Sequence, residues 1–147
     1  MSNPFLPIQT TMSTLSLYVN LPITDLAKST AFFTALGFSF NPKFTSEQAS
    51  CLVINEHINV MLLMRPFFAG FTPKPVTDAH ESTPAFMSLS VPSRAEVDAL
   101  MEKALAAGAV EHSPAKDHGF MVQRGFFDLD GHAWEIFYLN EAEFPQQ

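Results

Sequence analysis

The sequence predicts an α+β fold of two tandem modules, each made of one strand, one helix and three further strands. In the first half, an alternating strand-like run is expected to end at Pro22. A helix follows, and Gly37 supplies the left-handed residue that ends it. The same order returns at Pro92 and Gly108, about 70 residues later. Because a repeated order of elements constrains a fold more than one motif does, the repeat indicates one architecture used twice.

The first module is expected to occupy residues 13–65, after an N-terminal extension at 1–12. Its helix begins after Thr24 or Asp25, since the short side-chain oxygen of either residue is able to accept from free backbone N–H groups. The predicted elements of this module are a strand at 15–21, a helix at 25–36, and strands at 38–40, 49–54 and 58–64.

The second module is expected at residues 85–140, followed by a C-terminal tail at 141–147. Ser93 and Glu96 form a capping box that starts its helix. Strands are predicted at 85–91, near 110, at 119–127 and at 133–139. Residues 66–84 contain four prolines and no regular period, so they are interpreted as a linker. Its phenylalanines indicate packing onto another surface, as a lid or a subunit contact.

Composition excludes several classes of function. Hydrophobic residues make up 47%, which is enough for a packed core, and the net charge is −7. The eight Lys and Arg form no basic run, so no nucleic-acid partner is expected. No apolar segment reaches the roughly 20 residues of a membrane span. With no signal-peptide pattern, a cytoplasmic location is expected. Cys51, the one cysteine, lies in an apolar strand and is interpreted as a buried small side chain.

Two segments resemble known signatures. Residues 21–38, LPITDLAKSTAFFTALGF, resemble the first strand–helix pattern of the vicinal-oxygen-chelate superfamily, V-x-D-L-x-x-S-x-x-F-Y-x-x-x-L-G-F. Residues 128–136, DLDGHAWEI, resemble its closing D-P-D-G-x-x-x-E-[LIF] pattern. The superfamily includes glyoxalase I, bleomycin resistance proteins and extradiol dioxygenases. Within it, the chain is similar to glyoxalase-like proteins often labelled predicted lactoylglutathione lyases.

The resemblance implies a curved mixed sheet around a cavity, with helices outside, and a homodimer. In metal-using members, the first and last strands of each module supply ligands for Zn, Ni, Fe or Mn. These positions fall on Tyr18, Leu63, Phe86 and Glu135. Only Glu135 is a good ligand, because such cations prefer imidazole or carboxylate donors. We therefore expect that the usual metal site is largely lost and that no cofactor is needed.

Strand alternation predicts which side chains face the cavity, because successive side chains of a strand point to opposite faces. The expected lining is mostly apolar with a few polar groups, which is typical of a small-molecule site. The candidate ligand-binding residues on the strands are Tyr18, Asn20, Leu63, Arg65, Phe86, Ser88 and Phe137, with Glu135 as the candidate catalytic group.

Three further polar residues near the end of the chain are candidates for a site or for the surface. His118 and Arg124 are expected at the cavity mouth, where they either contact an anionic ligand or are simply solvated. His132 lies three residues before Glu135, and residues three apart on a strand point to opposite faces. We therefore interpret His132 as a surface histidine beside a turn.

Three functional hypotheses follow. The first is a metal-free module that binds a small, partly aromatic molecule. The alternative is an enzyme of the lyase, isomerase or dioxygenase kind, with Glu135 as metal ligand or general base. The third is a scaffold that only dimerises, with its cavity filled by phenylalanines.

Overall fold

The computed structural model describes residues 15–145, so the expected extension at 1–12 and the last two residues lie outside the described residues. The first module contains β1 (Leu17–Ile23), α1 (Leu26–Ala35), β2 (Ser39–Phe40), a 3-10 turn at Pro42–Phe44, β3 (Ala49–Val53) and β4 (Ile58–Met64). The linker begins with a short helix, α2 (Arg65–Ala69). The second module contains β5 (Phe86–Ser90), α3 (Arg94–Ala106), β6 (Val110–Glu111), β7 (Lys116–Asp117), β8 (Met121–Phe127) and β9 (Ala133–Leu139), and a 3-10 turn at Glu141–Glu143 follows.

Each module forms its own sheet with the same connectivity. The first sheet has the order β1-β4-β3-β2, and the second has β5-β9-β8-β6, with β7 also paired to β8. In both sheets the first strand runs parallel to the last strand of its module, and the other pairs are antiparallel. The predicted α+β fold of two βαβββ modules is therefore confirmed. Among residues 15–145, no helix has the length and apolar character to cross a membrane.

Both helices begin and end where the sequence predicts. The Asp25 carboxylate accepts from the backbone N–H of Lys28 at 3.0 Å, and Ser93 accepts from that of Glu96 at 3.2 Å. Gly37 and Gly108 end the helical segments with φ of 103° and 110°, a region that favours glycine. These local signals set where the two helices begin and end.

Pro22 does not end the first strand, which continues to Ile23. β1 lies at an edge of its sheet and pairs only with β4, where Pro22 is opposite Leu63. A strand at the edge tolerates proline because the missing N–H need not serve a second neighbour. The expectation that β1 stops at Pro22 was therefore wrong.

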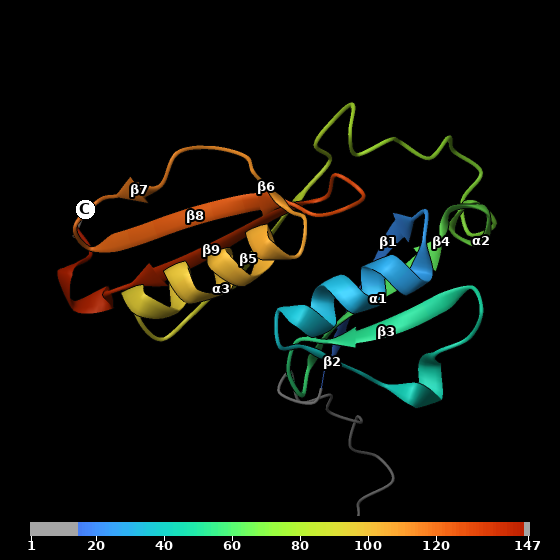
Figure 1. Ribbon diagram of the computed structural model, residues 1–147, viewed down its shortest axis with the longest axis horizontal. Helices are drawn as coiled ribbons and strands as arrows, with labels where there is room; N and C mark the ends of the chain where they lie inside the picture. Colours follow the sequence, from blue (N-terminus) through green and yellow to red (C-terminus); the bar gives the residue numbers. More distant parts are fainter. Residues whose placement is uncertain (1–14, 146–147) are drawn as a thin grey trace, which may run out of the picture.

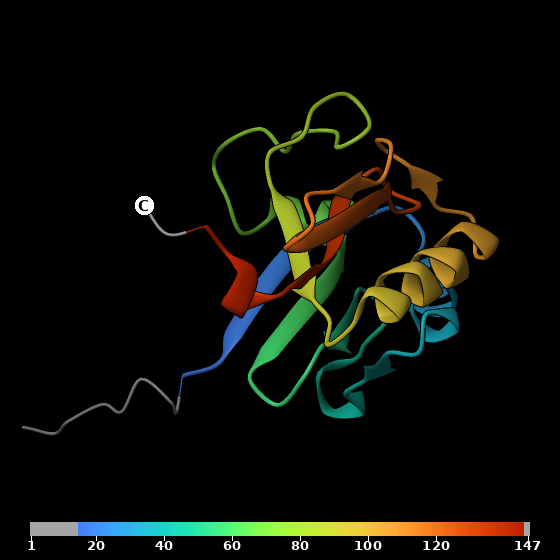
Figure 2. The ribbon, with the colours of Figure 1, turned by 90° about the vertical axis from the view of Figure 1, so that its left-hand side faces the viewer.

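The two helices lie on the same side of the sheets, and both sheets turn their other face away from them (Figures 1 and 2). Aromatic rings from both modules meet under the helices. Phe33 of α1 lies 5.3 Å from Trp134 of β9, and Phe32 lies 5.9 Å from Phe126 of β8, between ring centroids. One hydrophobic core therefore extends across both modules. Cys51 is fully buried, as expected, and burial raises the pKa of its thiol.

A turn between β8 and β9 joins the second module to the first. One carboxylate oxygen of Asp130 accepts from both the backbone N–H and the hydroxyl of Thr24, each at 2.9 Å. The other oxygen accepts from the hydroxyl of Ser29 at 3.1 Å. His132 is also buried, and its Nε2 donates to the Pro22 carbonyl at 2.7 Å. His132 is thus an inter-module contact, and its interpretation as a surface histidine was wrong.

Asp128 holds this turn in shape. Its carboxylate accepts from the backbone N–H groups of Asp130 and His132 and from the indole N–H of Trp134, each at 2.9 Å. Burial raises the pKa of Asp128, while the nearby His132 and these donors oppose the shift. The turn therefore keeps two buried carboxylates, and each is satisfied by several donors.

Replacing Asp130 with alanine should destabilise the protein far more than removing the ordinary helix cap. Asp130→Ala leaves three donors of the first module without their acceptor, and we expect a loss of about 2–4 kcal/mol in the free energy of unfolding. The control Asp25→Ala removes the exposed cap of the same helix and should cost about 1 kcal/mol. Urea denaturation followed by far-UV circular dichroism measures both. Equal losses would contradict the role of Asp130 between the modules.

Candidate functional site

The sheet face opposite the helices carries most of the predicted site residues, and much of it is open. Tyr18 and Asn20 on β1 are exposed, as are Phe86 and Ser88 on β5. Tyr18 is 46% and Phe86 57% exposed, which is high for aromatic side chains. Phe137 lies on the same face of β9 and is half-buried. This face is therefore the candidate functional surface.

The first sheet bears a hollow of about 440 Å³, called here the linker hollow. Asn20 and Leu63 come from the strands, whereas Phe68, Phe71 and Thr72 come from the linker. The linker helix α2 thus places its aromatic residues over the first sheet. Leu63 is buried beneath them, and Asn20 provides the one polar strand side chain.

The second sheet bears a smaller hollow of about 230 Å³, called here the Glu135 hollow. Glu135 lies in the middle of β9, opposite Ser88 on one side and Gly125 on the other. Its half-buried carboxylate accepts no hydrogen bond from any residue between 15 and 145. The residues that line this hollow are Phe86, His112, Ser113, Lys116, Gln123, Arg124 and Glu135.

His112 is the functional candidate that the sequence analysis missed. It follows β6, and its backbone N–H donates to the Gly125 carbonyl at 3.1 Å. A Cβ built on Gly125 would overlap the His112 ring, so the ring lies directly over Gly125 on the same face as Glu135. A glycine in the middle of a strand often marks a close approach of another group, and Gly125 was the available signal.

Arg124 borders the Glu135 hollow, but its charge is directed elsewhere. The guanidinium donates to Asp98 of α3 at 2.9 Å and to both carboxylate oxygens of Glu111 at 3.0 and 3.1 Å. Hydrogen bonds to Glu111 raise the pKa of Arg124. The structure thus directs Arg124 to the helix side, and its expected contact with an anionic ligand loses its geometric basis.

Two other predicted contacts also lie away from the hollows. His118 is exposed between β7 and β8 and stacks on Phe120, beside the start of α3, where Arg94 contacts Asp117. Arg65 donates to the linker carbonyls of Val76 and Thr77 at 3.4 and 3.2 Å. Arg65 therefore holds the Val76–Thr77 part of the linker close to the end of β4 by hydrogen bonds.

Strand pairing relates positions of the first module to those of the second. Ser88 pairs with Glu135, and Asn20 pairs with Met61. Asn20 and Ser88 are 68 positions apart, as are the helix caps Asp25 and Ser93. By this pairing, the residue of the first module equivalent to Glu135 is Met61, two residues before Leu63. Within residues 15–145, no three His, Cys, Asp or Glu residues come together as a metal-binding group.

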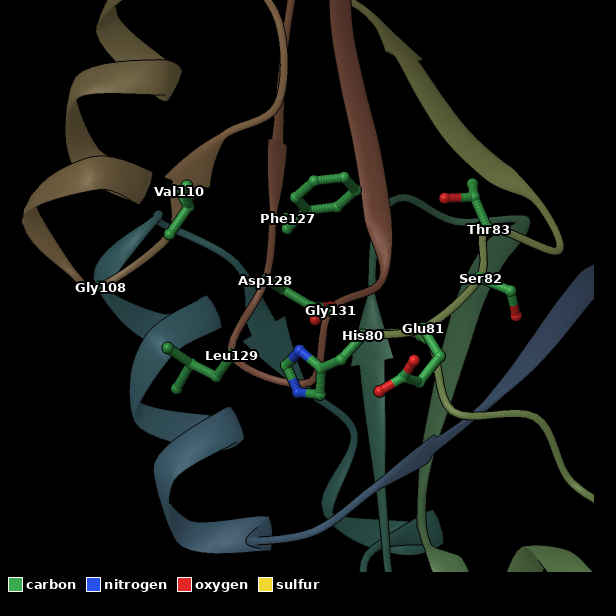
Figure 3. Close-up of a pocket in the computed structure, with 11 residues that line it drawn as sticks. His80, Glu81, Ser82, Thr83, Gly108, Val110, Phe127, Asp128, Leu129 and Gly131 are labelled. Carbon is green, nitrogen blue, oxygen red and sulfur yellow. The ribbon is translucent and has the colours of Figure 1, made fainter.

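A third hollow, of about 380 Å³, lies between the linker and the turn before β9 (Figure 3). His80 and Glu81 of the linker face Leu129 of the turn. A Cβ on Gly131 would approach the His80 backbone N at 2.8 Å, so glycine permits the linker to lie against the turn. Polar linker residues that are all exposed form one wall, and none of the predicted ligand-binding residues line it.

Comparison with known proteins supports the resemblance. Residues 16–55 match a family model described as bleomycin resistance protein-like N-terminal. No curated protein matches the sequence. A hypothetical protein from S. aureus is similar in structure, with a TM-score of 0.73 and 28% identity, over 84% of this chain and 92% of that one. A glyoxalase-related enzyme from Fulvimarina pelagi gives a TM-score of 0.72 and 24% identity, over 85% of this chain and 88% of that one.

A further solved structure shares the fold. It is a glyoxalase/bleomycin resistance protein/dioxygenase family enzyme from Burkholderia phytofirmans, with a TM-score of 0.69, 19% identity, and coverage of 83% of this chain and 96% of that one. The family match lies in the first module, and the shared fold extends over both. Residues 16–55 therefore resemble the bleomycin resistance protein-like family, and both modules share the fold of solved proteins of the glyoxalase/bleomycin resistance/dioxygenase group, also called the vicinal-oxygen-chelate superfamily.

Proposed function

We propose that this protein binds a small, flat, positively charged molecule at Glu135 without a metal ion. The observation that carries the proposal is the half-buried Glu135 carboxylate, which has no hydrogen-bond donor among residues 15–145 and is flanked by Phe86 and His112. A carboxylate in such surroundings favours a cationic partner, and aromatic faces attract cations as well.

The charges around the hollow agree with a cationic ligand. The net charge is −7, which draws cations toward the protein. Arg124 is neutralised by Glu111 and Asp98, so it does not compete for Glu135. Among the described residues that line this hollow, Lys116 is the one remaining cation, and it is exposed. An amidinium or guanidinium group suits Glu135 because it donates to a carboxylate through two parallel hydrogen bonds.

The side chains at the four usual ligand positions do not fit a divalent cation. Phe86 has no donor atom, and neither has Leu63. Met61, the alternative to Leu63 by strand pairing, offers only a weak thioether. Tyr18 is an uncommon ligand, which leaves Glu135 alone. The match to a bleomycin-resistance-like family agrees with a binding role. The second candidate is an enzyme with Glu135 as general base, which the same unpaired carboxylate favours.

We also propose that a second copy of the chain covers the open face. Exposed aromatic residues lie on both sheets, Tyr18 and Phe86 on the strands and Phe71, which is 71% exposed, on the linker. Exposed apolar surface of this kind typically marks an interface. In a two-fold dimer the same surface of each chain takes part, so every contact between two different residues occurs twice. We propose that the linker hollow of one chain faces the Glu135 hollow of the other, and the reverse. The two hollows favour this arrangement over a scaffold with a filled cavity.

Neutralising Glu135 should remove the preference for a cation. Benzamidinium and benzamide have the same shape, and we expect the wild type to bind benzamidinium at least about tenfold more tightly. Glu135→Gln should weaken benzamidinium binding by about tenfold and leave benzamide unchanged. Glu102→Gln, an exposed glutamate of α3, is the matched control. NMR titration measures the affinity of each of the three proteins for each of the two ligands, and equal binding of benzamidinium by wild type and Glu135→Gln would refute the proposal.

The protein should carry no stoichiometric metal. After purification without a tag or chelator, it should contain far less than one first-row transition-metal ion per chain, as measured by inductively coupled plasma mass spectrometry. EDTA should not change the affinity for benzamidinium. About one ion per chain, lost in Glu135→Ala, would instead establish Glu135 as a metal ligand.

The proposed dimer should dissociate when charge is placed on the open face. We expect the wild type to sediment as a dimer at micromolar concentration and Tyr18→Asp to shift toward monomer. Ala99→Asp adds the same charge on the exposed side of α3 and should stay dimeric. The highest concentration tested should be about 100 times the expected micromolar Kd of the dimer. A wild type that is still monomeric at that concentration would exclude the dimer.

A further inference from the structure

We infer that His112 is a specificity-determining residue, whose ring acts as a flat wall that selects planar ligands at Glu135. This inference rests on the proposed function, because it concerns the same hollow. It adds a residue that lies outside the four strand positions, and it assigns to that residue a role in shape selection instead of charge.

The position of the ring follows from the pairing of β8 with β9. Gly125 and Glu135 are directly opposite each other, so a side chain at position 125 would point to the same face as Glu135. That space is taken by the His112 ring, since a Cβ on Gly125 would overlap Nε2 and Cε1 of the ring. The same Cβ would lie 2.7 Å from the Trp134 carbonyl oxygen. Glycine at 125 is therefore required for His112 to lie on the sheet beside Glu135.

Hydrogen bonds at both ring nitrogens hold the ring in one orientation. Nε2 lies 3.2 Å from the Trp134 carbonyl, which only accepts, so Nε2 carries the proton. Nδ1 lies 3.2 Å from the Ser113 hydroxyl and accepts from it. With both nitrogens engaged by the protein, the ring offers a ligand neither a free lone pair nor a free N–H. What remains for the ligand is its flat face and its apolar edge.

His112 extends an aromatic row along this sheet face. Its ring centroid lies 5.8 Å from that of Phe86 and 5.3 Å from that of Phe127, with interplanar angles of 68° and 50°. These separations are typical of favourable aromatic pairs, so the three rings support one another. A ligand whose charged group meets Glu135 would place its body against this row. A flat body gains contact there that a puckered body of equal size loses.

Two amidinium ions of equal charge separate shape from charge. Benzamidinium is planar, whereas cyclohexanecarboxamidinium carries a puckered ring of similar size. We expect the wild type to prefer benzamidinium by about fivefold, the size of a typical aromatic contact. His112→Phe retains a flat ring and should keep the preference. His112→Ala should lower it to less than about twofold, and Gly125→Ala should do the same because it displaces the ring.

NMR titration measures each affinity, and circular dichroism checks that each variant is folded. His80→Ala, an exposed histidine of the linker, is the control and should behave as the wild type. If Gly125→Ala does not fold, the two His112 variants alone decide the outcome. An unchanged preference in folded His112→Ala would overturn the role of His112 while leaving a Glu135-dependent site intact. A wild type that binds neither amidinium overturns the proposed function, and the role of His112 with it.

Discussion

The contact of Asp130 with the start of α1 is the interaction on which the rest of this structure depends. One carboxylate from the last turn of the second module satisfies donors of Thr24 and Ser29 in the first. His132 adds a bond to the carbonyl of Pro22 on β1. Because these residues lie where the first strand passes into the first helix, the turn fixes both elements at once. The two modules therefore behave as one body around a shared aromatic core.

This arrangement decides where a site is able to form. With α1 and α3 buried against a common core on one side, the other face of each sheet lies away from these helices, and α2 covers only part of it on the first sheet. The carboxylates of the molecule divide accordingly. Asp128 and Asp130 are buried and saturated with donors, so they serve stability. Glu135 is half-buried and has none among the described residues, which makes its carboxylate available to a ligand.

Local signals in the sequence predict most of the fold. The caps Asp25 and Ser93, the glycines after the helices, and the alternation in β4 and β9 place these elements to within a few residues. The errors concern long-range contacts. His132 was assigned to the surface because its partner, Pro22, lies 110 residues away and no local pattern reports that bond. The strand of Pro22 was ended early for a related reason, since its edge position depends on sheet order.

The site was predictable only in part, because local patterns are visible in the sequence and long-range contacts are not. Alternation places Glu135, Phe86 and Phe137 on one face, but it says nothing about loop residues that fold over the strand. His112 reaches the face only because Gly125 leaves room for it. The spacing of the repeat also drifts between the modules, so the counterpart of Glu135 shifted from Leu63 to Met61 once the strand pairs were known.

Under the proposed metal-free site, closure of the face has a different requirement. In the proposed dimer, a second copy removes water from around Glu135. An ionised carboxylate that loses water without gaining a cation or donors is costly. Within residues 15–145 no group of three metal-binding side chains comes together, and Arg124 is already paired with Glu111 and Asp98. A cationic ligand supplies that compensation. Ligand binding and association of the two chains should therefore strengthen each other, because each is linked to the same desolvated carboxylate and linkage is reciprocal.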